Sequence, residues 1–353
     1  MPFGSHTLLL SLEGGLLAFG RNNDGQLGLG HKNDQWKPVK VPWSGTEPVQ
    51  VDWGDAHSLV LDAEGGVWEA GSSPSSSPSL TFQRILGLPC IALVAAGPSH
   101  SASIDTEGGL WVWTRKDSLS WACSLPQRVE GLPAIIKVAC GCNFLVAEAE
   151  EGLWVLGNNY KGQLGLGHTN SALQPTLVQV EDLSEGPLRC LAALSEGVIF
   201  IDSQGGVFSA GDNYNGQLGR SPSSVNKLQR VSNIPPMLSV SCGYGHTLCL
   251  DENGSVWSWG CGRTGQLGTG NTWTNQSQPS LVPSLEGISA LVAGADHSLA
   301  FPQEGGLLVF GLNGFGELGL NHAEIELSPM LCPIQPALPL LANSSKKKSA
   351  RFL

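Results

Sequence analysis

The chain has 353 residues, with 46 glycines, 14% charged residues and a formal net charge of −11. An acidic chain of this kind does not coat nucleic acid or an anionic membrane surface, and no apolar run reaches the ~20 residues that a membrane span needs. Many glycines and few charges predict frequent tight turns around an apolar interior.

A short apolar segment closed by glycine recurs with a period of roughly 50 residues, which indicates a repeat fold. The seven closing residues are Gly20, Gly71, Thr114, Gly157, Gly211, Gly260 and Gly311. Five units also carry a histidine fourteen residues earlier, namely His6, His57, His100, His246 and His297. In the other two units, Phe144 stands thirteen residues before Gly157 and Gly197 stands fourteen residues before Gly211. The shared internal spacing predicts seven copies of one structural unit.

Each unit is predicted to contain four short β-strands. The first is apolar and ends in glycine, as in 93–97, and the second follows the histidine, as in 58–61. The third alternates large and small apolar side chains, as in 110–113, with the period of two that is typical of strands. The fourth carries a proline, as in 175–178. Short strands with a ~50-residue period predict the blades of an all-β propeller.

The two ends of the chain suggest how the ring closes. The first unit begins at His6 and lacks the apolar strand that should precede its histidine. Residues 337–343 (Ala-Leu-Pro-Leu-Leu-Ala-Asn) have the character of that strand. We therefore expect a C-terminal strand to complete the N-terminal blade and remove its exposed edge, with Pro339 tolerated at a sheet edge.

The glycine-rich segments 20–30, 157–167 and 211–219 resemble the repeat of the regulator of chromosome condensation family. Five of the seven units carry this motif, and the resemblance covers residues 2–343. It implies one domain, 1–343, that forms a seven-bladed β-propeller of four-stranded antiparallel blades, followed by a short basic tail, 344–353. The best-known activity of the family is guanine-nucleotide exchange on the small GTPase Ran.

Two neighbouring units depart from the pattern. After Gly71 the sequence is Ser-Ser-Pro-Ser-Ser-Ser-Pro-Ser, and after Thr114 it is Arg-Lys-Asp, without the Gly-Gln-Leu-Gly motif in either case. The missing length is about that of one loop. The second and third units are therefore expected to give one sector of the ring a different rim.

No constellation for catalysis or for a cofactor is evident. The histidines recur one per unit, so we expect them to hydrogen-bond backbone between strands rather than to bind metal. The nine cysteines form no C-x-x-C pair, and Cys140 and Cys242 occupy the same place in two repeats; we expect small buried apolar residues in a reducing compartment. The third-strand tryptophans are expected in the blade core: Trp68, Trp111, Trp113, Trp154, Trp257 and Trp259. We predict no metal and no cofactor.

The remaining hypothesis is a binding surface on the atypical units. Tryptophan and arginine dominate interface hot spots, and the candidate contact residues in this acidic protein are Arg84, Arg115, Lys116, Trp121 and Arg128. The preferred function is a non-enzymatic protein-interaction module that presents its loop rims to a protein partner. The alternative is a guanine-nucleotide exchange factor for a Ran-like small GTPase. Because the N-terminus lacks the basic start of a signal peptide, we expect an intracellular protein, cytoplasmic or nuclear.

Overall fold

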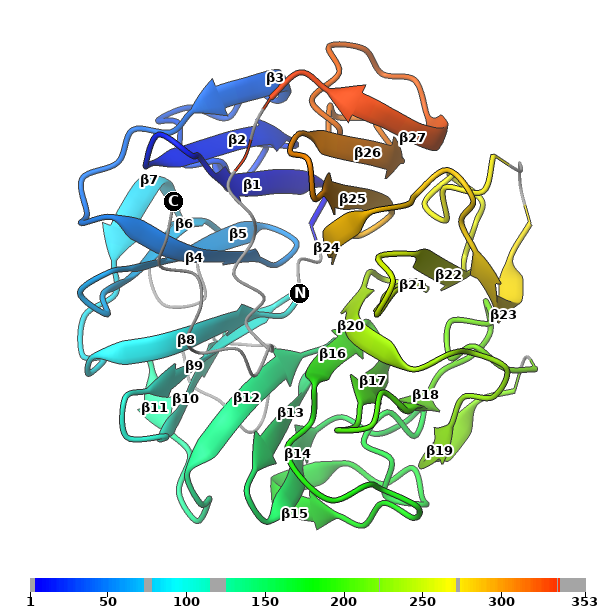
Figure 1. The fold of residues 1–353 in the computed structure, drawn as a ribbon. Helices are drawn as coiled ribbons and strands as arrows, with labels where there is room; N and C mark the ends of the chain where they lie inside the picture. The colour runs from blue at the N-terminus through cyan, green and yellow to red at the C-terminus, as the bar shows by residue number, and fades with distance from the viewer. Residues whose placement is uncertain are drawn as a thin grey trace.

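A computed structural model describes residues 4–72, 78–114, 125–221, 223–270, 274–334 and 336. These residues form seven antiparallel sheets arranged as a ring, with the first strand of each complete sheet nearest the centre (Figure 1). The predicted seven-bladed, all-β propeller is confirmed. The described residues include no helix that could span a membrane.

Strands follow chain order within each blade. The first three blades contain β1 (His6–Leu10), β2 (Leu16–Gly20), β3 (Gln35–Lys40); β4 (Pro48–Trp53), β5 (His57–Asp62), β6 (Val67–Gly71), β7 (Ser79–Arg84); and β8 (Ile91–Ala96), β9 (His100–Asp105), β10 (Leu110–Thr114), β11 (Gln127–Arg128). The fourth and fifth contain β12 (Ile135–Cys140), β13 (Phe144–Ala149), β14 (Gly152–Gly157), β15 (Ala172–Val178); and β16 (Cys190–Leu194), β17 (Gly197–Ile201), β18 (Val207–Gly211), β19 (Val225–Arg230). The last two contain β20 (Met237–Cys242), β21 (His246–Asp251), β22 (Val256–Gly260), β23 (Gln276–Leu281); and β24 (Ile288–Ala293), β25 (His297–Pro302), β26 (Leu307–Gly311), β27 (Glu326–Cys332).

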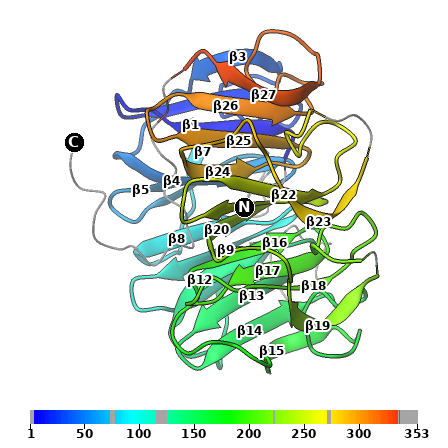
Figure 2. The same ribbon diagram turned by 45° about the vertical axis from the view of Figure 1, so that its right-hand side comes forward.

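The first blade has three strands among the described residues, β1-β2-β3, whereas the other six blades have four. Residues 337–343, predicted to complete it, lie outside the described part of the chain. The first and seventh blades nevertheless lie side by side in both views of the ring (Figures 1 and 2). Leu9 and Phe19 share an apolar cluster with Leu299 and Phe301, so the ring is closed by packing of side chains between these two blades.

The spacing between histidine and glycine sets the strand register. His57 lies opposite Gly71, and His246 lies opposite Gly260. Phe144 and Gly197, which replace the histidine, keep the same pairing with Gly157 and Gly211. The repeat inferred from the sequence is therefore one hairpin whose ends meet on one side of the blade.

The histidines connect neighbouring blades through hydroxyl groups. His6 Nε2 lies 2.8 Å from Ser58 Oγ, and His246 Nε2 lies 3.0 Å from Ser298 Oγ. Each hydroxyl donates its own proton to a backbone carbonyl, as Ser298 Oγ does to Gln266 O at 2.8 Å, so the imidazole Nε2–H is the donor to the serine. The predicted direct bond to backbone is thus wrong for His6 and His246.

The tryptophans of the third strands divide into two groups. Trp113 and Trp259 are fully buried, as predicted for blade core. Trp68, Trp111 and Trp257 are half-buried and donate their indole N–H to Asp62, Asp105 and Asp251, respectively. Trp154 is also half-buried. The indoles of Trp68, Trp111 and Trp257 therefore join the third strand to the turn that precedes it.

The loops that carry the Gly-Gln-Leu-Gly motif hydrogen-bond to the fourth strand of the next blade. The Gly30 N–H donates to Leu80 O of β7 at 2.8 Å, and the Gly167 N–H donates to Asn226 O of β19 at 2.7 Å. Glycine is required because Gly162 has a φ of 77° and a Cβ there would stand 2.4 Å from Asn226 Cα. The segments 72–79 and 115–124 contain no glycine.

Candidate interaction surface

The antiparallel order of the strands gives the ring two different faces. The hub face carries the loops between first and second strands and between third and fourth strands. The turn face carries the turns between second and third strands and the connections from each fourth strand to the next blade. The candidate contacts that the structure describes, Arg84 and Arg128, can be assigned to one of these two faces.

Arg84 and Arg128 are exposed at the turn face, at the ends of β7 and β11. They lie opposite Trp68 and Trp111 in the sheets. Burial alone would raise the pKa of Asp105, but hydrogen bonds from Trp111 Nε1 and backbone N–H groups, together with the charge of Arg128, hold the pKa below its usual value.

The same position is held by Arg230 opposite Phe208 in the regular fifth blade. Arginine at this place is therefore not confined to the atypical units. Arg115, Lys116 and Trp121 lie outside the described residues. Thr114, which precedes them, is at the hub-face end of β10, where its hydroxyl donates to Ser99 O at 3.1 Å. The structure thus brings Arg84 and Arg128 to the turn face.

Two exposed tyrosines occupy the tips of hub-face loops. Tyr160 is 75% exposed and Tyr214 is 80% exposed, and each stands three residues after the glycine that closes its third strand. Arg263 holds this position in the next blade and is also exposed. Three consecutive blades therefore present an aromatic or guanidinium group at equivalent places.

The loops that carry these tips are held by a buried asparagine. Asn213 Oδ1 accepts the Leu218 N–H at 2.9 Å, and Asn213 Nδ2 donates to Ser221 O at 2.8 Å. Asn159 bonds Leu164 and His168 in the same way in the fourth blade. Because their backbone is fixed in advance, the loop tips lose little conformational freedom when a partner binds.

Two hollows open on the hub face. One of 230 Å³ is lined by Asp212, Cys261, Asp296 and their neighbours in the fifth and sixth blades. The other, of 260 Å³, is lined by Ser5, Arg21, Asp24, Asp55 and Ala56. Tyr244 borders both. We call the pair the hub cavities.

The carboxylates of the hub cavities lack full compensation by cations. Burial raises the pKa of Asp55 to about 6 against the opposing charge of Arg21. Burial likewise raises the pKa of Asp296, although a hydrogen bond from Gln266 opposes the shift. A cationic group from a partner would stabilise both ionised carboxylates, so these cavities suit lysine or arginine side chains.

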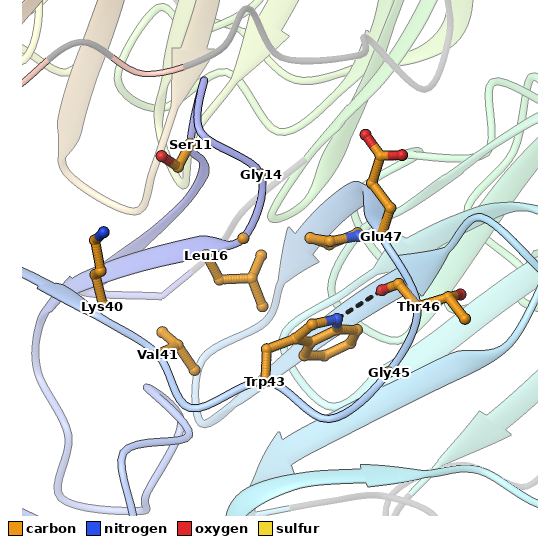
Figure 3. A pocket seen from close by; sticks show the side chains of 11 residues that line it. Ser11, Gly14, Leu16, Lys40, Val41, Trp43, Gly45, Thr46 and Glu47 are labelled. Atoms are coloured by element: carbon orange, nitrogen blue, oxygen red, sulfur yellow. Dashed lines mark hydrogen bonds between the residues drawn. The ribbon is translucent and has the colours of Figure 1, made fainter.

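A larger hollow lies on the turn face between the first and second blades (Figure 3). Its volume is 420 Å³, and Leu16, Val41 and Trp43 form its apolar part. The Trp43 indole N–H donates to Thr46 O at 2.6 Å, and Lys40 at the edge pairs with Glu13 at 3.0 Å. This hollow offers apolar contact but no converging charged groups.

Buried thiols offer no reactive nucleophile. Cys140 and Cys242 are buried, as predicted, and burial raises the pKa of both thiols well above the usual range. The cysteines that the structure describes form no disulfide with one another. Among the described residues, no group of three His, Cys, Asp or Glu side chains could hold a metal ion.

Comparison with known proteins identifies the repeat. A family model described as "Regulator of chromosome condensation (RCC1) repeat" matches residues 13–61, 204–250 and 253–301. A second model with the same description matches residues 238–266. Prp20p from Saccharomyces cerevisiae has the same fold, with a TM-score of 0.81, 19% identity and coverage of 92% of this chain and 87% of that one. The chain therefore carries RCC1 repeats.

Relatives of this RCC1-repeat chain differ in length. It is 26% identical to the regulator of chromosome condensation of Xenopus laevis over 92% of this chain and 74% of that protein. It is 32% identical to the human probable E3 ubiquitin-protein ligase HERC3 over 67% of this chain, but that match spans only 22% of the ligase. The propeller is thus shared by proteins that differ in the rest of their length.

The matched ranges do not include the two segments that lack the glycine loop. None of the matched ranges covers residues 62–203, which include both segments without the glycine loop. The sequence interpretation concentrated on the second and third units and missed Tyr160 and Tyr214. A usable signal existed, since tyrosine follows Gly-Asn-Asn in one repeat and Gly-Asp-Asn in the next. The hub cavities had no such signal because they are assembled from several blades.

Proposed function

We propose that this chain is a non-enzymatic protein-interaction module that binds a protein partner on its hub face. The observation that carries the proposal is the row of exposed loop tips, Tyr160, Tyr214 and Arg263, beside the hub cavities. Tyrosine and arginine supply most hot-spot energy in protein interfaces. Rigid loops add to this because little entropy is lost when they are immobilised.

Of the contact residues proposed from the sequence, some fit an interface on the hub face and others do not. Arg115 follows Thr114 directly, and Thr114 lies on the hub face; we therefore keep Arg115, Lys116 and Trp121 as proposed contacts of that face. Arg84 and Arg128 stand on the turn face. If they bind a partner, it is through a separate surface.

The proposal is tested by capturing partners on the tagged full chain and identifying them by mass spectrometry. Tyr160→Ser combined with Tyr214→Ser should weaken binding about tenfold or more. Leu86→Ser is the matched control, because Leu86 is 81% exposed on the turn face between β7 and β8. Loss of the partner in the Leu86 variant alone would place the binding surface on the turn face and overturn the proposal.

The second candidate is guanine-nucleotide exchange on a Ran-like small GTPase. The similarity to the Xenopus regulator over 92% of this chain and 74% of that protein supports it, and so does the likeness to Prp20p, whose structure is described with its binding properties to Gsp1p and histones. Nucleotide exchange requires a surface that is complementary to the GTPase, and it needs no residues for acid–base catalysis. Faster release of labelled GDP from such a GTPase at catalytic amounts of this chain would support it. Absence of both faster release and GTPase binding would exclude it.

A further inference from the structure

The hub cavity of 260 Å³ combines a cation and carboxylates in its wall, and we call it the Arg21 cavity. Its lining consists of Ser5, Arg21, Asp24, Asp55, Ala56 and Tyr244. Burial raises the pKa of Asp55 and the charge of Arg21 opposes that rise, so these two groups lie close enough to interact. Within the described part of the chain, however, Arg21 forms no ion pair with Asp24 or Asp55. The opposite charges therefore remain available to a ligand.

A buried amide next to this cavity has no acceptor for its N–H groups. Gln26 is fully shielded from solvent, and its Nε2 has no hydrogen-bond partner among the described residues. Its Oε1 accepts the Asp24 N–H at 2.9 Å, which places the amide beside the cavity wall. Because a buried donor without an acceptor destabilises the fold, a ligand that supplies the acceptor gains affinity.

In the sixth blade the equivalent amide reaches a carboxylate of the next blade. Gln266 Nε2 donates to Asp296 Oδ1 at 3.2 Å. Asp296 directly precedes the histidine of the seventh blade, and Ala56 holds that place in the second blade. Since Ala56 lines the Arg21 cavity, the direction in which Gln266 donates leads Gln26 Nε2 into this cavity.

In the fifth blade the equivalent amide reaches a carboxylate of its own loop. Gln217 Nε2 donates to Asp212 Oδ2 at 2.8 Å. Asp212 directly follows the glycine that closes the third strand, and Arg21 holds that place in the first blade. A guanidinium offers donors only, and Arg21 Nε also has no partner among the described residues. The two positions that supply an acceptor in other blades are thus a methyl group and a cation here, and both line the cavity.

These groups define the chemistry of a ligand. The donors of Arg21 and Gln26 favour a carboxylate, because charge-assisted hydrogen bonds are the stronger ones. The carboxylates of Asp24 and Asp55 favour an ammonium group, although Asp55 Oδ1 already accepts the Tyr244 hydroxyl. At 260 Å³ the cavity is smaller than the roughly 300–1,000 Å³ of sites for drug-sized ligands, so both charges must belong to one small molecule. An α-amino acid carries them on a single carbon atom.

We propose that the Arg21 cavity binds a free α-amino acid. Arg21 and Gln26 hold its carboxylate. Asp24 and Asp55 hold its ammonium group. The inference goes beyond the proposed function, because it assigns a small-molecule site and requires no protein partner. The described lining of the second hub cavity has three carboxylates but no cation, so that cavity lacks a group for the amino-acid carboxylate and remains suited to a cationic side chain of a partner.

Isothermal titration calorimetry of the full chain with each proteinogenic L-amino acid in turn tests the inference. At least one should bind with a Kd below about 1 mM. Its N-acetyl derivative lacks the ammonium group and its amide lacks the carboxylate, so each should bind at least about tenfold more weakly. Absence of binding by every amino acid would overturn the inference. An amide that binds as tightly as the acid would also overturn it, because the ligand would then be the N-terminus of a peptide.

Ala56→Asp should remove the site by copying an arrangement that the fold already contains. It offers Gln26 Nε2 the carboxylate that Asp296 offers to Gln266. The variant should therefore be at least as stable as the wild type in thermal unfolding and bind the amino acid at least about tenfold more weakly. Arg21→Met removes the cation, keeps an unbranched side chain and should weaken binding by a similar factor.

Glu196→Gln is the matched control, because Glu196 lines the second hub cavity and not the Arg21 cavity. It removes one negative charge from the hub face and should leave the Kd of the amino acid unchanged. Unaltered binding in both Ala56→Asp and Arg21→Met would place the amino acid elsewhere and overturn the inference. A loss in Glu196→Gln as large as in those variants would attribute binding to the overall charge of the hub face and would equally contradict it.

Discussion

Tyr244 donates its phenolic hydrogen bond to Oδ1 of Asp55 across the centre of the ring. The two residues hold the same position in the sixth and second repeats, two residues before His246 and His57, respectively. Tyr244 also separates the two hub cavities. Tyr244 therefore connects the sixth blade to the second and separates the acidic residues of one hub cavity from those of the other.

Tyr244→Phe should lower the free energy of unfolding by about 1 kcal/mol, the value of a typical hydrogen bond, because this one is exposed to solvent. The phenolic hydroxyl stabilises the carboxylate of Asp55, whose pKa burial raises to about 6. A double-mutant cycle with Asp55→Asn, followed by urea unfolding at pH 8, measures the coupling. Strictly additive effects would show that the contact contributes nothing to stability.

Glu317 should make the fold less stable at high pH. It stands where four other loops have glutamine, and its Oε2 accepts the Phe315 N–H at 2.7 Å as Gln266 Oε1 accepts the Thr264 N–H at 2.9 Å. Burial raises the pKa of Glu317 to about 7 from 4.5. The folded state thus keeps its proton after the unfolded state has released it, so stability is lost as pH rises from 4.5 through 7.

Glu317→Gln removes this penalty, and we expect the gain in unfolding free energy to be about 2 kcal/mol larger at pH 8 than at pH 5. Gln266→Glu is the converse control, because it would place a carboxylate where Gln266 Nε2 now donates to Asp296 Oδ1 at 3.2 Å. That variant should be less stable than the wild type at pH 8. An equal effect of Glu317→Gln at both pH values would contradict the assignment.

The strand register could be predicted from the sequence because its determinants are local. His57 and Gly71 are fourteen residues apart, and tight turns fix which residues of a hairpin face each other. The hydroxyl that receives the His6 imidazole could not be predicted, because Ser58 belongs to the next blade. For the same reason the sequence did not indicate the hydrogen bond between Tyr244 and Asp55, which are 189 residues apart. Arg84 and Arg128 were found as exposed residues, but only the fold shows that they stand on the turn face.

The buried histidines should make the protein sensitive to acid. Burial lowers the pKa of both His246 and His297 to about 3. Between pH 3 and 6.5 the unfolded chain therefore binds more protons than the folded chain, and stability falls as pH decreases through this range. The opposite shift of Glu317 partly offsets the effect above pH 4.5.

His246→Gln retains a donor for Ser298 and removes one titrating group. The slope of unfolding free energy against pH, measured by urea unfolding between pH 4 and 5.5, should decrease by about 1.4 kcal/mol per pH unit. His168→Gln at an exposed loop position is the control and should leave the slope unchanged. The same slope in His246→Gln as in the wild type would mean that this imidazole is already protonated in the folded state.

A buried ion pair in the fourth blade was missed in the sequence, although lysine and glutamate within two neighbouring apolar strands were a visible signal. Lys137 Nζ lies 2.5 Å from Glu148 Oε2, and the two residues face each other across β12 and β13. Glu148 Oε1 also accepts the Leu188 N–H at 2.6 Å, which ties this blade to the chain that enters the next one. Both side chains are at least 95% shielded from solvent.

Lys137→Met leaves the Glu148 carboxylate buried without its cation, and we expect a loss of about 3–5 kcal/mol in unfolding free energy. Glu148→Gln added to Lys137→Met should restore most of that loss, because glutamine is neutral and still offers an acceptor to Leu188. Lys161→Met is the matched control, since Lys161 is half-exposed and 3.9 Å from Asp212; it should cost under about 1 kcal/mol. A double variant no more stable than Lys137→Met alone would show that packing around Lys137, and not the uncompensated charge, determines the loss.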